Sequence, residues 1–221
     1  MSSRMLVVLG VVGLVLGLAG AAQATLITGV TATASTEVGS WSPASRTTDN
    51  SGMSDAASPH TVNFSLDGSK PTHSYAYGDM WLDKWNETIA NQWITFDLGS
   101  AQTVAEFAVW NYNESWAEDD RGTKTLYIWT SPDATGDTWT QQGGLQTFAK
   151  APAHDTRAPG ESFVLSSSWT NVRRVKFDIE TNWGDGSHVG LSEGRFYTPE
   201  PATLALLGLG GLGMLLSRKR K

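Results

Sequence analysis

Short runs of alternating apolar and polar residues dominate the middle of this chain, and they constrain its fold more than any other feature. In one run, Val175, Phe177 and Ile179 alternate with charged residues. A period of two turns one face of a strand toward a core and the other toward water. Ser, Thr, Gly, Asn and Asp separate the runs, and no stretch has the period of an amphipathic helix of three turns. The middle of the chain is therefore predicted to be all-β.

The runs are close enough together to form one domain, which we place at residues 25–197. About eight strands in a chain of this length favour a single β-sandwich or jelly roll. The stretch 40–91 is long, polar and irregular, and such loops are usually functional or cation-bound. The predicted strands are 29–36, 93–98, 105–109, 124–130, 163–165, 174–180 and 191–197.

The first 24 residues have the organisation of a secretory signal peptide. Arg4 supplies a positive start, 6–22 is apolar, and Ala22-Gln23-Ala24 is a small-x-small cleavage site. We expect a signal helix here and cleavage by signal peptidase after Ala24. An uncleaved N-terminal membrane anchor is the alternative, although the apolar run is short for a spanning helix, which needs ~20 residues.

The last 24 residues have three parts in a fixed order. Pro199-Glu200-Pro201 is followed by an apolar, Gly-rich stretch at 202–216 and by four basic residues at 218–221. Basic residues after an apolar segment stay cytoplasmic, so an exported chain with this end stops in the inner membrane. We expect a hydrophobic helix within this tail, which we place at 198–221.

This tail resembles the PEP-CTERM sorting signal of Gram-negative bacteria. The resemblance implies recognition by an exosortase, cleavage near Pro199-Glu200-Pro201, and release to the cell surface or the extracellular matrix. Anchoring in the inner membrane would then be transient. An ordinary tail anchor is the alternative, but the apolar stretch is short for a stable span.

Composition narrows the function of the middle region. The sequence has no cysteine, which excludes disulfides, thiolate nucleophiles and thiolate metal sites. The formal net charge is −6, but residues 25–198 keep only 11 of the 16 Lys and Arg and 21 of the 22 acids, which gives −10. Nucleic acid is therefore not an expected partner, because phosphate binding needs a basic face.

Four short motifs occur in the order found in one extracellular family. They are Gln92-Trp93-Ile94-Thr95-Phe96-Asp97-Leu98-Gly99, an earlier Leu66-Asp67-Gly68, Ser131-Pro132-Asp133 with Trp139, and Val189-Gly190-Leu191-Ser192-Glu193 before Arg195-Phe196-Tyr197. Together they resemble discoidin-like domains (coagulation-factor type C, galactose-binding-like). The insertion before Trp93 is longer than in the plain family, and the hairpin after Asp133 lacks its tight Asp-Gly. The resemblance implies a binding module, in many members one that recognises sugars.

The same resemblance implies one structural Ca²⁺ ion. Its expected ligands are the carboxylates of Asp67 and Glu193 with carbonyls near Ser69 and Thr72, and Ca²⁺ prefers such oxygen ligands. In the alternative reading, Asp67 caps a turn and Glu193 lies at a strand edge.

The first candidate ligand site follows the predicted strand 105–109. Asn111, Asn113, Glu114 and Arg121 supply donors and acceptors for sugar hydroxyls, and Trp116 supplies a flat apolar face. Similar segments occur in bacterial discoidin-like proteins. Alternatively, the two Asn residues satisfy the backbone of a long turn, and Arg121 pairs with Glu114 or Asp119.

A second candidate combines Trp81 with Trp183 and His188, which lie on either side of a Gly-Asp-Gly sequence within 182–188. In this fold both segments would lie among the loops at one end of the sandwich. The alternative for Trp81 is a place in the core, because large aromatic residues are highly buried on average.

Catalysis is not expected. His60, His73, His154 and His188 lack metal-ligand spacing, and no Gly-x-Ser-x-Gly elbow or phosphate-binding Gly loop is present. The favoured function is a non-catalytic surface or matrix protein that binds polysaccharide. A purely structural matrix protein is the second hypothesis. A glycan-active hydrolase is the third, and it requires two carboxylates facing one cleft.

Overall fold

The β domain forms a compact unit from Thr25 to Pro199 in a computed structural model of the chain. The structure describes residues 24–56, 70–85, 87–115, 118–152 and 156–199. Both expected terminal helices lie outside these ranges. Within them there is no α-helix, and no helix is long and apolar enough to cross a membrane.

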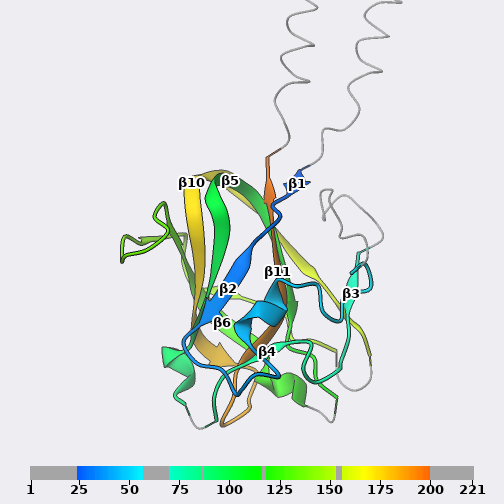
Figure 1. Ribbon diagram of the computed structural model, residues 1–221. Coiled ribbons are helices and arrows are strands. Elements are labelled where there is room, and N and C mark those ends of the chain that lie inside the picture. Colours follow the sequence, from blue (N-terminus) through cyan, green and yellow to red (C-terminus); the bar gives the residue numbers. More distant parts are fainter. Residues whose placement is uncertain (1–23, 57–69, 86, 116–117, 153–155, 200–221) are drawn as a thin grey trace, which may run out of the picture. The chain divides into compact units, whose positions relative to one another are not determined.

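Eleven strands and three short 3-10 helices make up the described part of the domain (Figure 1). The expected all-β sandwich is confirmed. The strands are β1 (Thr25–Leu26), β2 (Thr31–Ala34), β3 (Thr72–His73), β4 (Trp81–Leu82), β5 (Trp93–Asn111), β6 (Thr123–Ser131), β7 (Thr140–Gln141), β8 (Gln146–Thr147), β9 (Ala158–Pro159), β10 (Glu161–Asn182) and β11 (Gly190–Thr198), and the 3-10 helices are η1 (Ala44–Thr47), η2 (Ile89–Asn91) and η3 (Glu118–Arg121).

Two long antiparallel strands, β5 and β10, run through both layers of the sandwich. The first half of β5 pairs with β2 and with the second half of β10, which also pairs with β6. These strands form the first layer. In the second layer, the second half of β5 pairs with β11 and with the first half of β10. Strands β1 and β4 extend the second layer through β11, while β3 and β9 form a separate small sheet.

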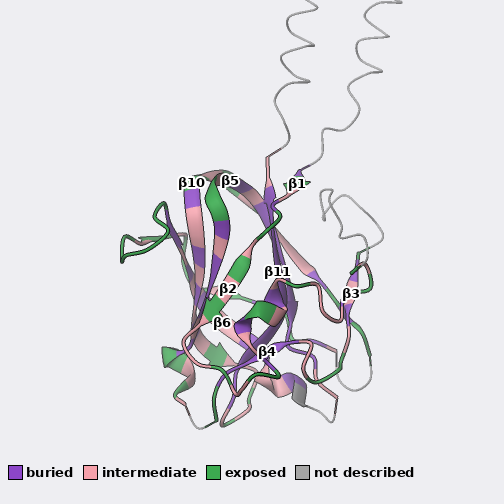
Figure 2. Ribbon diagram, viewed as in Figure 1, coloured by how far each residue is buried: buried purple, intermediate pink, exposed green. Residues whose placement is uncertain are grey.

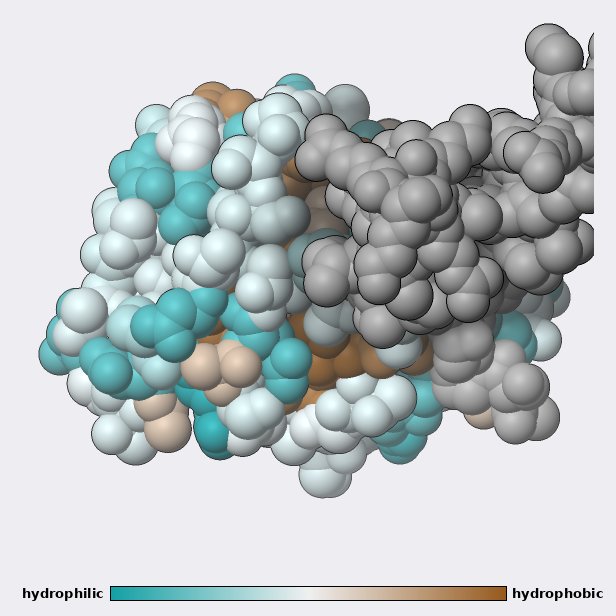
Figure 3. Space-filling view, turned by 90° about the horizontal axis from the view of Figure 1, so that it is seen from above, coloured by the Kyte–Doolittle hydropathy of each residue, from teal (hydrophilic) through white to brown (hydrophobic). Residues whose placement is uncertain are grey.

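The core lies between these layers and is rich in phenylalanine. Phe96 in the first half of β5 lies 5.3 Å from Phe177 of β10 and 5.1 Å from Phe196 of β11, measured between ring centroids. Phe107 in the second half of β5 lies 5.9 Å from Phe177. All four rings are buried, and contacts of this kind add to the stability gained from burial. Figure 2 shows buried positions along both long strands. On the face drawn in Figure 3, most of the described residues are hydrophilic and the hydrophobic patches are small.

The predicted strands at 93–98 and 105–109 are one strand. The chain continues between them because Gly99 adopts a positive φ of 81°, a conformation that costs glycine little. The Asp97 carboxylate accepts the Gly99 N–H at 2.8 Å and fixes this irregular point. Six strands of two residues each raise the number above the expected eight. Four elements, β3, β4, η1 and η2, lie in the stretch 40–91 that was expected to be irregular.

Candidate functional site

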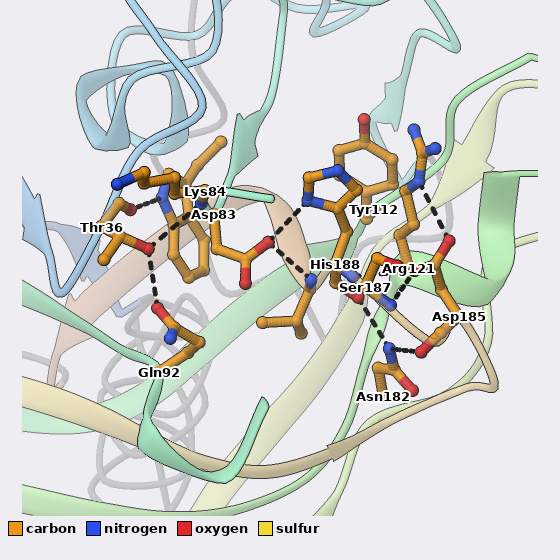
Figure 4. Close-up of polar contacts among 12 residues, drawn as sticks. Thr36, Asp83, Lys84, Gln92, Tyr112, Arg121, Asn182, Asp185, Ser187 and His188 are labelled. Atoms are coloured by element: carbon orange, nitrogen blue, oxygen red, sulfur yellow. Dashed lines mark hydrogen bonds and ion pairs between the residues drawn. The ribbon is translucent and has the colours of Figure 1, made fainter. Parts of the chain in front are cut away.

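The end of the β domain opposite β1 brings together most of the residues that the sequence singled out (Figure 1). Backbone hydrogen bonds join its segments: the Asp83 N–H donates to the Val189 carbonyl, and the Trp183 N–H donates to the Asp120 carbonyl, both at 3.0 Å. We call this region the loop end and define it as residues 36–42, 75–85, 112–115, 118–121 and 182–190. Figure 4 shows its polar contacts.

Asn111, the last residue of β5, is buried, and its side chain is bonded to the chain itself. Its Nδ2 donates to the carbonyls of Thr123 at 2.7 Å and Ala149 at 2.8 Å. Its Oδ1 accepts the Tyr112 N–H at 2.9 Å. All three bonds join the Asn111 side chain to backbone groups, which agrees with the alternative that the sequence left open, in which this residue satisfies the backbone of a turn.

Asn113 has a similar position. Its side chain is buried, and Nδ2 donates to the Thr156 carbonyl at 2.7 Å. Two of the candidate ligand residues therefore hold the loop after β5 in place, and they leave contact with a ligand to the residues around them.

Glu114 and Arg121 form the centre of a polar network. Arg121 Nη1 donates to Glu114 Oε2 at 2.9 Å, and Arg121 Nε donates to Asp185 Oδ2 at 3.3 Å. The Tyr112 hydroxyl donates to the same Glu114 oxygen at 2.6 Å. Burial and the nearby Glu114 charge raise the pKa of Tyr112, so this hydroxyl remains a donor. The network links the chain after β5, η3 and the turn between β10 and β11.

The acidic pair at the start of η3 has a different partner. Lys150 Nζ lies 2.9 Å from Asp119 Oδ2 and also pairs with Asp120. Asp119 is buried rather than solvated. Arg121 thus pairs with Glu114, one of the two partners considered from the sequence. Asp119, the other one, forms its ion pair with Lys150.

The turn between β10 and β11 is closed by Asp185 and Asn182. Asp185 Oδ1 accepts the N–H groups of Ser187 and His188, each at 2.7 Å. Asn182 Nδ2 donates to the carbonyls of Asp185 at 2.6 Å and His188 at 2.7 Å (Figure 4). These bonds hold the turn in one conformation, and they keep Asp185 in position to meet Arg121.

His188 and Asp83 form a buried pair beside this turn. His188 Nδ1 lies 3.0 Å from Asp83 Oδ1, which also accepts the Val189 N–H at 2.9 Å. Burial raises the pKa of Asp83 to about 6, against the opposing effects of the Val189 N–H and His188. His188 is thus enclosed by protein, and its ring meets the Trp85 ring edge-on at 4.8 Å.

The two candidate tryptophans occupy different environments. Trp81 is fully buried, and its Nε1 donates to the Thr36 carbonyl at 3.0 Å. It is a core residue, as in the alternative that the sequence left open, and it presents no face to a ligand. Trp183 is half-buried, with the Lys124 ammonium 4.9 Å from its ring centroid.

Four exposed aromatic residues of the loop end were not identified from the sequence. Trp41 is 55% exposed, Tyr75 38%, Tyr77 46% and Trp85 58%. The Trp41 and Tyr77 rings lie 6.2 Å apart. Burial and the charge of Glu114 raise the pKa of Tyr77, while the charge of Arg121 opposes the shift. The sequence feature that could have indicated them is their location in the long stretch 40–91. Residue type alone does not show which aromatic side chains in that stretch are exposed.

Glu193 lies outside the loop end, in the second layer. Its carboxylate is buried, with Oε1 at 3.5 Å from Arg195 Nε and Oε2 without a hydrogen-bond partner among the described residues. Burial raises its pKa well above the ordinary value, and the charges of Asp49 and Asp55 add to this shift. Arg195 in turn binds Asp55 through both terminal nitrogens, at 2.8 and 2.9 Å.

Of the other expected Ca²⁺ ligands, Thr72 has a carbonyl that is already hydrogen-bonded, and two lie outside the described residues. The Thr72 carbonyl already accepts the Ser54 N–H at 2.8 Å and Arg157 Nη2 at 2.9 Å. Asp67 and Ser69 lie outside the described residues, as do Trp116, Ala22, Glu200 and Pro201. Within the described ranges, no three acidic or His side chains converge on a point that would hold a metal ion.

The chain's end matches a known sorting signal. Residues 198–221 match the PEP-CTERM protein-sorting motif. This chain carries a PEP-CTERM sorting signal. The signal begins at the last residue of β11, and Pro199 follows directly, so the sorting signal and the β domain share a border. At the other border, Ala24 is buried just before β1.

Solved structures similar to this chain include carbohydrate-binding modules and a discoidin-type domain. The family 32 module of NanJ from C. perfringens, solved in complex with galactose, has a TM-score of 0.50 and 17% identity over 79% of this chain and 98% of that one. An F5/8 type C domain from Bacteroides fragilis has a TM-score of 0.49 and 14% identity, covering 82% and 100%. Chitosan-binding module 1 of a Paenibacillus sp. IK-5 chitosanase/glucanase has a TM-score of 0.47 and 22% identity, covering 78% and 98%. No curated protein matches the sequence. The likeness to the NanJ module confirms the expected discoidin-like fold.

Proposed function

We propose that this protein is exported, is sorted through its PEP-CTERM signal, and binds carbohydrate at the loop end without catalysing a reaction. The observation that carries the proposal is the exposed ring pair Trp41 and Tyr77 beside the Glu114–Arg121 ion pair. Sugar recognition needs apolar faces next to fixed donors and acceptors, and this region provides both.

The polar network makes the site rigid before a ligand arrives. Glu114, Arg121 and Asp185 are held by one another and by the turn between β10 and β11. A carboxylate has about four acceptor positions, and among the described residues the hydrogen bonds of Glu114 use only Oε2, so we assign Oε1 to a sugar hydroxyl. A site that is already ordered loses less conformational entropy on binding.

The charge of the domain selects among sugars. Residues 25–198 carry a net charge of −10, which disfavours acidic glycans unless a cation bridges them. Neutral sugars are the preferred class, and the host cell's own exopolysaccharide is a candidate source. Galactose is the natural first probe, because the NanJ module of this fold was solved with it.

A structural Ca²⁺ ion at Glu193 is part of the proposal. The buried Glu193 Oε2, which has no hydrogen-bond partner among the described residues, and the neighbouring charges of Asp49 and Asp55 favour a bound cation, since Arg195 carries a single positive charge. Oxygen donors of this kind suit Ca²⁺. Asp67 and Ser69 remain its predicted further ligands.

The two ends of the sequence support a proposal for how the protein is exported and processed. We place signal-peptidase cleavage after Ala24 and exosortase cleavage near Pro199, with a transient inner-membrane anchor between the two events. The final location is the cell surface or the extracellular matrix. Because the sorting signal starts at the last residue of β11, the anchored domain has no linker to extend into the matrix.

A glycan panel tests the binding proposal. The purified chain is screened with Ca²⁺ against neutral and acidic glycans, and hits are measured by calorimetry. Tyr77→Ala and Trp85→Ala, which change exposed side chains, are each expected to weaken binding about tenfold. Trp93→Ala, on the outer face of the first layer, is the matched control. No hit with Ca²⁺ present would reject the proposal.

A further inference from the structure

A large groove lies on the side of the sandwich, away from the loop end. Its volume is about 790 Å³, within the range of about 300–1,000 Å³ typical of ligand pockets. Its walls come from β6, from the segment around β7, and from residues 163–171 in the first half of β10. We call it the side groove, and it shares no residue with the loop end.

An irregularity in β10 builds one wall of the side groove. Val164 pairs with Glu106 and Trp169 with Val104, so β10 advances five residues while β5 advances two. The extra residues include Ser166, Ser167 and Ser168, which line the groove. Bulges of this kind redirect side chains and are common next to functional sites.

The groove also has aromatic residues in its walls. Phe163 stacks on Phe107 with centroids 4.7 Å apart and an interplanar angle of 8°, and Trp169 stacks on Phe107 at 5.7 Å and 24°. Phe163 and Trp169 are half-buried. Val164 beside them is 64% exposed. The stacking holds both rings in fixed positions at the groove surface.

The opposite wall supplies amide and hydroxyl groups. Gln142 Nε2 donates to Thr130 Oγ1 at 2.8 Å, and the Gln142 N–H donates to the Ile128 carbonyl at 2.8 Å. Thr140 and Gln146 complete this side. The amide of Gln142 is therefore oriented by the protein rather than free to rotate.

None of the described residues that line the side groove has a charged side chain, although the domain carries a net charge of −10. Hydroxyls, amides and fixed aromatic rings without charge match the surface of a neutral sugar chain, whose hydroxyls need paired donors and acceptors. We propose that the side groove is a second carbohydrate site, specific for a neutral oligosaccharide. It goes beyond the loop-end site, and neither proposal depends on the other.

Calorimetry with the purified full chain tests this second site. The probes are cellohexaose, laminarihexaose and mannohexaose, with hexagalacturonate as the acidic comparison. Ser167→Arg places a long charged side chain in the groove at an exposed position, and Ser100→Arg is the control at an exposed position outside it. Trp85→Ala affects only the loop end.

At least one neutral hexaose is expected to bind, and Ser167→Arg is expected to weaken it about tenfold or more. Ser100→Arg should leave that affinity unchanged, and Trp85→Ala, which changes only the loop end, should retain saturable binding of the same hexaose. The affinity should also be insensitive to salt between about 0.05 and 0.5 M, because no charge takes part. The inference is overturned if no neutral hexaose binds, if only the acidic one binds, or if Ser167→Arg has no effect. Loss of binding only in Trp85→Ala would also overturn it and leave the loop-end site standing.

Discussion

Arg121 Nη1 lies 2.9 Å from Glu114 Oε2, and this contact ties η3 to the segment that follows β5. The same guanidinium reaches Asp185 in the turn between β10 and β11. One side chain thus connects three segments of the loop end, and the geometry of the proposed sugar site depends on it.

Replacing Arg121 with Ala should destabilise the domain. Glu114 and Asp185 would lose their cation while their carboxylates stay mostly buried, which costs about 1–3 kcal/mol. Urea unfolding of both proteins measures the difference. Arg46→Ala is the control, because its ion pair with Asp49 is exposed and should contribute at most about 1 kcal/mol. Equal losses in the two variants would contradict a structural network at Arg121.

Gly190 should not tolerate a side chain. A Cβ atom there would lie 2.5 Å from the Trp81 carbonyl oxygen and 2.5 Å from the Tyr112 ring. We expect Gly190→Ala to cost about 1–3 kcal/mol of stability. Gly186→Ala is the control in the same turn region, since nothing lies within 4 Å of its added Cβ. Thermal unfolding compares the two variants. A melting temperature of Gly190→Ala equal to that of the wild type would show that the Trp81 carbonyl and the Tyr112 ring do not pack tightly against position 190.

The β-sandwich was predictable because apolar and polar residues alternate with a period of two, and side chains of a strand alternate between the core and the solvent with the same period. Phe96 and Phe177 fall on the apolar faces of their runs, and both are buried in the structure. The continuity of β5 was not predictable, because it depends on one glycine conformation between two runs. The number of strands was also underestimated, since strands of two residues are too short to show a period.

The site was only partly predictable, because its decisive contacts join distant segments. The sequence proposed Glu114 and Arg121 together, and the structure places them in contact. It gave no sign that Asp185, 64 positions from Arg121, completes the group. Trp81 and Trp85 are four residues apart in one polar stretch, yet one is buried and the other exposed. Residue type alone does not separate them.

Asp83 should make stability depend on pH. Its pKa is raised from 3.8 to about 6, so the folded state holds this proton more tightly than the unfolded state. The resulting stabilisation is complete below about pH 4 and is lost as the pH rises through about 6. Relative to Asp83→Asn, the wild type should therefore lose on the order of 1–3 kcal/mol between these limits.

Asp97 provides the opposite control for this experiment. Burial raises its pKa, but hydrogen bonds from Arg173 and the Gly99 N–H outweigh burial and lower it overall. Its stabilisation is present above pH 4 and is lost as the pH falls. Chemical unfolding of the wild type, Asp83→Asn and Asp97→Asn from about pH 2 to about pH 7 measures both effects. A pH profile of Asp83→Asn parallel to that of the wild type would contradict the assignment.

Ca²⁺ removal tests the ion at Glu193. If the ion binds only the folded state and is present at about 100 times its dissociation constant, EDTA should lower the melting temperature by about 5–10 °C. Glu193→Gln should abolish this difference, because the amide is a weaker ligand for Ca²⁺ than the buried carboxylate. Identical melting curves of the wild type with and without EDTA would exclude a structural ion.

The sorting signal makes a prediction in the producing bacterium. Replacing Pro199-Glu200-Pro201 with three Ala residues should leave the protein in the membrane fraction, because the exosortase would lose its recognition motif. Fractionation and immunoblotting measure the distribution. Replacing Ser217 with Ala, within the signal but outside the motif, is the control. Unchanged release of the triple variant would refute processing at this site.

Sugar binding at the loop end can be observed directly through the tryptophan side chains. Indole ¹H–¹⁵N NMR signals of the purified chain are assigned by single substitutions and followed during titration with a glycan that binds. The proposal predicts that the signals of Trp41 and Trp85 shift in a saturable way, because these exposed rings flank the polar network. Saturation that leaves both signals unmoved, with or without shifts elsewhere in the domain, would contradict it.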